Sequence, residues 1–218
     1  MKDGRQLVYA ALLIVLIAGA VAWILVQQRE AAQPELRQHA ALGVVMAEQT
    51  AKQLEKREKK RVVAVSVNLH DPALQAEEQA FLARLKILNP QAEIKEFYHL
   101  EPEGEKRLGP GFGLSPRRFV RLVQHNLKAD VLVSFIGTPN PSSDEMRELT
   151  NKVPRFIAST RDLAAVKKLL EQHRLRDAIV PRYQFPAPGS DHPKSSREWF
   201  DRYYQIVTTN ELNTLPTQ

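Results

Sequence analysis

The stretch VVAVSV, residues 62–67, decides the fold of this 218-residue chain. Five of its six residues are apolar and four are β-branched, which is typical of a strand buried on both faces of a parallel sheet. Asp71 and Pro72 follow after a short turn, and they suit the N-cap and the first position of a helix. A buried strand that leads directly into a helix indicates an α/β protein.

The same alternation of strand and helix continues along the chain. Right-handed connections between such strands place them in a parallel sheet with helices on both faces. We therefore predict a three-layer flavodoxin-like or Rossmann-like α/β domain over residues 62–207, with a mostly parallel five-stranded sheet. A last helix is predicted from Ser196 to about Val207, followed by an irregular tail at residues 208–218. The other four predicted strands lie at residues 92–100, 131–136, 155–158 and 178–180.

An uncharged apolar run, LVYAALLIVLIAGAVAWILV, occupies residues 7–26. As a helix it is long enough to cross roughly 30 Å of hydrocarbon, so we predict a transmembrane helix that tethers the protein to a lipid bilayer. The segment Ala20-Val21-Ala22 would also pass as a signal-peptide cleavage site. Because the apolar run continues beyond it to Val26, an uncleaved signal-anchor is the favoured interpretation.

The short tail ahead of the apolar run, residues 1–6, is basic. It carries Lys2 and Arg5 against one acidic residue, Asp3. Basic tails of this kind stay in the cytoplasm, which is the positive-inside rule. The sequence therefore predicts a single-pass protein of the inner (cytoplasmic) membrane, with its large domain in the periplasm.

A helical stalk is predicted between the anchor and the domain, at residues 34–61. Its apolar residues recur at steps of three and four, which is the helical period. They could pack on the chain's own domain or form a coiled-coil seam with a partner helix, and the sequence leaves both alternatives open. The stripe consists of Leu36, Ala40, Val44, Ala47, Ala51 and Leu54.

The formal net charge of +6 is concentrated locally, in a basic run at the end of the stalk. Such a run suits either the C-terminus of a solvated helix or contact with lipid phosphates. No aromatic residues interleave with it, so base stacking is not indicated and no nucleic-acid partner is predicted. The run consists of Lys52, Lys56, Arg57, Lys59, Lys60 and Arg61.

Catalytic motifs are sparse. The chain has no cysteine, which excludes thiolate chemistry and disulfides. Gly109, Gly111 and Gly113 lie in a charged loop and lack the strand-adjacent spacing of a dinucleotide fingerprint. His70 and Asp71 are adjacent in a turn, which favours a helix cap beside a surface histidine over a metal pair. We therefore predict no catalytic residue, no metal and no cofactor, and we lean against an enzyme.

Polar residues follow the predicted strands, at the edge of the sheet where doubly wound folds bind ligands. The stretches VVAVSVN (62–68) and ADVLVSFIGTPN (129–140) resemble one lobe of the type I periplasmic sugar-binding proteins. That resemblance implies that Asn68, Thr138 and Asn140 face a ligand. The candidate ligand-binding residues at this edge are Asn68, Thr138, Asn140, Thr160 and Arg161.

Two functions are compatible with this organisation. The anchor, the apolar stalk and the lack of catalytic groups favour a non-catalytic, membrane-anchored accessory or assembly subunit of a cell-envelope complex, with a membrane or envelope protein as its partner. The polar strand ends favour the alternative, a periplasmic domain that binds or senses a small molecule. An assembly subunit needs a free helix surface, whereas a binding domain needs a polar pocket.

Overall fold

The computed structural model describes residues 34–67, 70–101, 114–149, 153–182 and 193–214. One sheet runs through the domain in the order β2-β1-β3-β4-β5-β6, with β1 to β5 parallel and β6 antiparallel to β5. The strands are β1 (Arg61–Val67), β2 (Glu93–Leu100), β3 (Val131–Ser134), β4 (Arg155–Ser159), β5 (Leu175–Pro181) and β6 (Tyr204–Val207). The helices are α2 (Pro72–Leu88), α3 (Pro116–His125), α4 (Ser143–Arg147), α5 (Leu163–Glu171) and α6 (Ser196–Tyr203), with a 3-10 helix, η1, at Thr209–Thr214. The predicted α/β class and its parallel strands are confirmed.

The sixth strand corrects the predicted last helix. That helix, α6, ends at Tyr203, and the chain then pairs with β5 so that Ala178 lies opposite Val207 and Pro181 opposite Tyr204. Tyr204, Ile206 and Val207 have side chains that favour strands, and the outer edge of β5 offers backbone groups that need partners. Sheet pairing therefore prevails over helix continuation, and the sheet has six strands where five were predicted.

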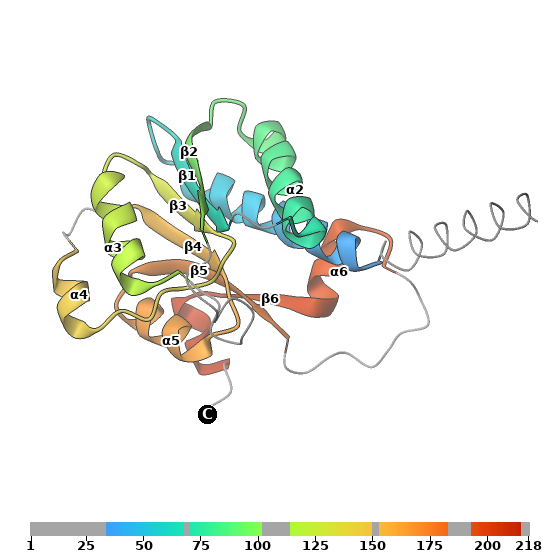
Figure 1. Cartoon of the computed structure of the whole chain (residues 1–218). Helices are drawn as coiled ribbons and strands as arrows, with labels where there is room; N and C mark the ends of the chain where they lie inside the picture. The colour runs from blue at the N-terminus through green and yellow to red at the C-terminus, as the bar shows by residue number, and fades with distance from the viewer. Residues whose placement is uncertain (1–33, 68–69, 102–113, 150–152, 183–192, 215–218) are drawn as a thin grey trace, which may run out of the picture.

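The two faces of the sheet carry separate apolar cores, which makes the domain three-layered (Figure 1). Val63, Val65 and Val67 point to the face covered by α3, α4 and α5. Val62 and Ala64 point to the opposite face, covered by a helix at residues 34–54, α2 and α6. Successive strand residues alternate between faces, and here both faces are covered, which explains why nearly the whole stretch is apolar.

The helix at residues 34–54, called here the N-terminal helix, differs from the predicted stalk. It ends at residue 54 instead of 61, and its apolar side packs on the chain's own sheet. Leu42, Val45 and Met46, which lie outside the predicted stripe and are bulkier than most of it, are also buried there. Packing on the domain, one of the two alternatives, is therefore what the structure contains. Of the predicted stripe, Ala47 and Leu54 are buried in that core, and Leu36, Ala40, Val44 and Ala51 are half-buried.

The predicted membrane anchor at residues 7–26 lies outside the described residues. Within the described ranges, no helix combines the length and the apolar character that a membrane span requires. The basic run predicted at the end of the stalk leads from the N-terminal helix into β1, and Lys56, Arg57 and Lys59 are exposed there.

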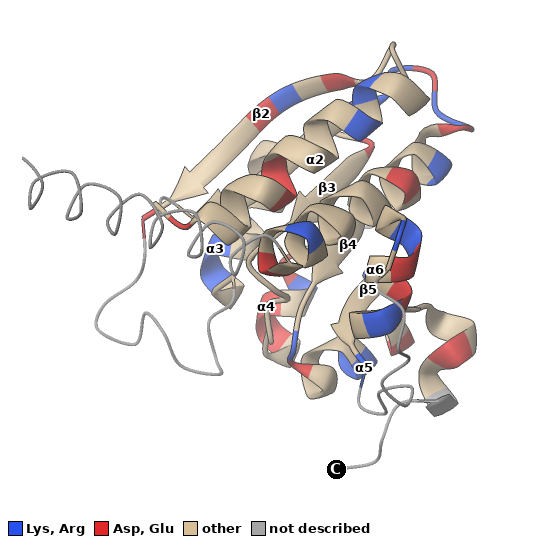
Figure 2. Ribbon diagram, turned by 90° about the vertical axis from the view of Figure 1, so that its right-hand side faces the viewer, with Lys and Arg blue, Asp and Glu red and all other residues tan. Residues whose placement is uncertain are grey.

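The first edge strand, β2, is protected by charge. Glu93, Lys95 and Glu96 place charges of both signs along its first half (Figure 2), and Lys95 Nζ lies 2.5 Å from Glu93 Oε1. Charged side chains on an exposed edge discourage pairing with another chain.

The N-terminal helix and α2 approach each other very closely at Gly43. A Cβ atom placed on Gly43 would lie 2.0 Å from the carbonyl oxygen of Glu77 and 2.9 Å from its carbonyl carbon. Both are backbone atoms of α2, so neither can move aside without displacing that helix. Glycine is therefore required at this crossing for steric reasons.

Candidate functional site

Two of the predicted ligand-binding residues, Thr138 and Thr160, meet at the carboxyl edge of the sheet. Their hydroxyl oxygens are 3.1 Å apart, and both side chains are buried. The backbone N–H of Asp162 donates to Thr160 Oγ1 at 3.1 Å, and the N–H of Thr160 donates to the carbonyl of Ile179 at 2.9 Å. The two threonines therefore hold neighbouring strand ends together.

The turn after β3 places the exposed residues of this edge. Ser134 Oγ donates to the carbonyl of Gly137 at 2.7 Å, and Gly137 has φ 98°, which favours glycine. This turn presents Asn140 to solvent, while Arg161 is exposed directly after Thr160. Asn68 lies outside the described residues. Of the predicted site, the structure thus leaves Asn140 and Arg161 free to contact a solute at adjacent strand ends.

A polar contact that sequence reasoning missed joins the N-terminal helix to α2. His39 Nδ1 lies 2.5 Å from Glu77 Oε1, and Glu77 is buried. The hydrogen bond to Glu77 raises the pKa of His39 against the opposing effect of burial. Burial raises the pKa of Glu77, and the hydrogen bond with His39 opposes that shift. The two residues are 38 positions apart in the sequence, so no local sequence motif predicts that they pair.

Tyr204 extends these polar contacts to the other edge of the sheet. Gln38 Nε2 donates to the Tyr204 hydroxyl at 3.0 Å, and Arg182 Nε donates to the Tyr204 carbonyl at 3.0 Å. Burial is the main cause that raises the pKa of Tyr204. The first turns of the N-terminal helix are therefore bonded to both α2 and β6, close to the carboxyl edge.

A second chain of polar contacts runs from Ser66 through Glu78 to His99. The Ser66 hydroxyl donates to Glu78 Oε1, and His99 Nε2 lies 3.3 Å from Glu78 Oε2. The carboxylate stands between the other two groups, so the histidine cannot take the serine proton as it does in a nucleophilic triad. In the part of the chain that the structure describes, no three His, Asp or Glu residues are arranged to hold a metal ion.

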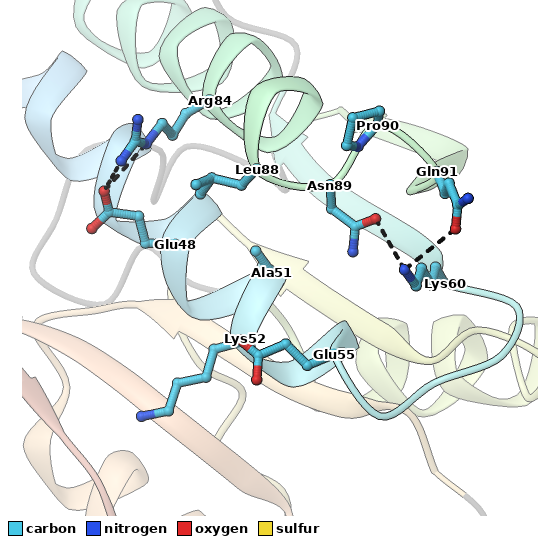
Figure 3. Close-up of a pocket in the computed structure, with 10 residues that line it drawn as sticks. All are labelled: Glu48, Ala51, Lys52, Glu55, Lys60, Arg84, Leu88, Asn89, Pro90 and Gln91. Atoms are coloured by element: carbon cyan, nitrogen blue, oxygen red, sulfur yellow. Dashed lines mark hydrogen bonds and ion pairs between the residues drawn. The ribbon is translucent and has the colours of Figure 1, made fainter.

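A groove lies at the other end of the sheet, near the amino ends of the strands (Figure 3). It opens between the N-terminal helix and α2, with a volume of about 660 Å³. Arg84 bridges to Glu48 through Nη2 at 2.8 Å and Nε at 3.2 Å. Lys60 Nζ lies 3.5 Å from both Asn89 Oδ1 and Gln91 Oε1. The remaining lining residues are Ala51, Lys52, Glu55, Leu88 and Pro90.

Comparison with protein-family models and with curated proteins gives no match. Among solved structures, the chain is similar to AraP, an arabinose-binding protein from Geobacillus stearothermophilus, with 12% identity, a TM-score of 0.56, and coverage of 82% of this chain and 63% of AraP. A carbohydrate transporter solute-binding protein from Agrobacterium radiobacter, in complex with D-arabinose, has 15% identity, a TM-score of 0.55, and coverage of 82% and 63%.

A LacI-type transcriptional regulator from Bacteroides fragilis is similar to the same degree, with 10% identity, a TM-score of 0.54, and coverage of 82% of this chain and 62% of the regulator. The chain thus spans less than two thirds of the length of these proteins. At such identities the shared property is the fold, so the resemblance to periplasmic sugar-binding proteins is confirmed at that level.

Proposed function

We propose that the domain binds a small polar molecule at the carboxyl edge of its sheet, through Asn140 and Arg161. The observation that carries the proposal is the buried bond between Thr138 and Thr160, which fixes two adjacent strand ends beneath those exposed groups. An amide and a guanidinium offer several donors and one acceptor, which suits the hydroxyl groups of a sugar. The location is also where doubly wound sheets bind ligands.

The structural neighbours support a sugar as the first ligand to test. Two of them, from Burkholderia graminis and Agrobacterium radiobacter, were determined in complex with D-arabinose. This chain spans less than two thirds of each of these two proteins.

The test is a titration of the full chain with D-arabinose, followed by amide NMR shifts. We expect shifts centred on Asn140 and Arg161, with binding weakened about tenfold in Asn140→Ala and in Arg161→Gln. Arg147→Gln is the matched control, because Arg147 is an exposed arginine on α4 paired only locally with Asp144. Equal weakening in the control, or shifts elsewhere, would overturn the assignment to this edge.

The first of the two predicted functions, an assembly subunit, loses the support that it drew from the stalk. It required a free apolar stripe on the N-terminal helix, and Ala47 and Leu54 are buried in the chain's own core. A membrane tether at residues 7–26, with the domain outside the cytoplasm, stays part of the proposal. Protease added to intact spheroplasts should digest the domain, and complete protection until lysis would reverse that orientation.

A further inference from the structure

Lys60 occupies an unusual position at the end of the groove between the N-terminal helix and α2. Its φ of 49° is in the left-handed region, which is uncommon for a residue with a side chain. Within the described ranges, its ammonium group donates to two amide oxygens, Asn89 Oδ1 and Gln91 Oε1, each at 3.5 Å. No carboxylate forms an ion pair with it among the described residues. Residues held in sparsely populated backbone conformations are concentrated at functional sites.

Asn89 supplies the second observation. The residue as a whole is only 8% exposed, and its Oδ1 atom faces Lys60. The Nδ2 amide group points away from Lys60 toward the N-terminal helix (Figure 3), and no described residue accepts a hydrogen bond from it. The orientation of the amide follows from the ammonium, which requires an oxygen. Among the described residues, no fully buried side-chain nitrogen or oxygen lacks a hydrogen-bond partner, so this amide donor reaches the solvent of the groove. It lies there beside a cation that has no carboxylate partner.

The walls of the groove restrict which ligands can bind to both the Lys60 ammonium and the Asn89 amide. Ala51 and Leu88 provide apolar surface, and the Arg84–Glu48 ion pair bridges the two helices at one end. Glu55 lines the opposite wall and takes part in no ion pair among the described residues. A carboxylate there accepts hydrogen bonds from hydroxyl groups but repels a second negative charge.

We propose that this groove binds a hydroxylated small molecule with one anionic group, a carboxylate or a phosphate, held by Lys60 and Asn89 Nδ2. The oxyanion accepts from the ammonium and the amide, and Lys52 adds a second positive charge to the lining of the groove. Hydroxyl groups of the same ligand donate to Glu55. The N-terminal helix runs from the carboxyl edge to this end of the sheet, about 30 Å for its length, so this site is separate from the Asn140–Arg161 edge.

The probes are D-gluconate for the carboxylate, D-glucose 6-phosphate for the phosphate, and D-glucose as the neutral control. Titration of the full chain, followed by NMR shifts of Lys60, Gln91 and the Asn89 side-chain amide, reports on this groove alone. We expect one or both anions to shift these signals, and the anion that does so identifies the class. Equal shifts with D-glucose, or no shift with either anion, would overturn the proposal.

Variants distinguish anion binding at a specific site from attraction to the general positive charge of this surface. We expect Lys60→Gln to weaken anion binding about tenfold and Lys59→Gln, the adjacent matched control, to weaken it less than twofold. Asn89→Asp should abolish binding while leaving the melting temperature unchanged or raised, because the new carboxylate pairs with Lys60. Equal effects of the two lysine variants, or undiminished binding in Asn89→Asp, would contradict the assignment.

Discussion

The two ends of the helix pair formed by the N-terminal helix and α2 are built differently. Near the carboxyl edge, Gly43 lets the backbones meet, and His39 bonds to the buried Glu77. Toward the amino ends of the strands, the same helices separate, and the long side chains of Arg84 and Glu48 span the gap.

The two ends differ in how many polar groups remain available to bind a ligand. At the tight end, His39, Gln38 and Tyr204 bond to other groups of the chain. At the open end, Lys60 and Asn89 bond to each other and still have donors that face a groove. We therefore assign stability to the first end and ligand binding to the second, and the following predictions test that division.

Truncation of the core between the two ends should have the largest effect. Phe81 is 0% exposed and packs edge-on against Phe135, with ring centroids 5.3 Å apart. Phe81→Ala should lower the free energy of unfolding by about 3–5 kcal/mol, measured by denaturant melts. Leu88→Ala, at the open end and 41% exposed, should cost about 1 kcal/mol or less. Similar losses in the two variants would mean that the groove is in fact packed.

Gly43→Ala should destabilise the protein, although alanine favours helices. The added Cβ would lie 2.0 Å from a backbone oxygen of α2, so the helices must separate. We expect a loss of about 1–3 kcal/mol, against a gain of about 1 kcal/mol from helix propensity alone. A thermal melt shows whether the steric cost outweighs the gain in helix propensity, because the two shift the melting temperature in opposite directions. A raised melting temperature would show that the close crossing does not exist.

The His39–Glu77 pair should make stability depend on pH. The hydrogen bond raises the pKa of His39 above its ordinary value of 6.5, so the folded protein binds this proton more tightly than the unfolded chain. Its contribution is fully present below pH 6.5 and is lost as pH rises through the folded pKa. Burial raises the pKa of Glu77 above 4.5, which acts in the same direction.

Glu77→Gln tests this pair by denaturant melts at several pH values. The neutral amide no longer raises the pKa of His39, so the fall in stability above pH 6.5 should disappear, with a cost of about 1–2 kcal/mol at pH 6. Glu35→Gln is the control, because Glu35 acts on His39 only through its charge. An unchanged pH dependence in Glu77→Gln would place the titrating group elsewhere.

The smallest effect is expected at Lys60, and it should be a gain. Glycine adopts φ 49° without the steric cost that a side chain carries, although it is more flexible when unfolded. Lys60→Gly should therefore raise the free energy of unfolding by about 0.5 kcal/mol while it removes anion binding. His173, with φ 54°, is the control: His173→Gly should raise stability similarly and leave binding intact.

Local patterns in the sequence determined most of the sheet and its covering helices. The alternation of apolar strands with helices predicted β1 to β5, because residues such as Asp71 begin helices through contacts a few residues away. The same reasoning brought Thr138 and Thr160 to one edge, since parallel strands end together. The sequence could not show whether Asn140 and Arg161 bind a ligand, because exposed polar residues at a sheet edge do not reveal which molecule, if any, they contact.

Only the tertiary structure decided where the N-terminal helix lies, that residues 204–207 form a strand, and that Lys60 and Asn89 share a groove. An apolar helix stripe packs equally well on its own sheet or on a partner, so periodicity leaves the choice open. The sheet resolves it by offering an uncovered apolar face, to which Val62 and Ala64 contribute. Pairs such as His39 and Glu77, 38 residues apart, then form because the helices they occupy are brought together by that burial.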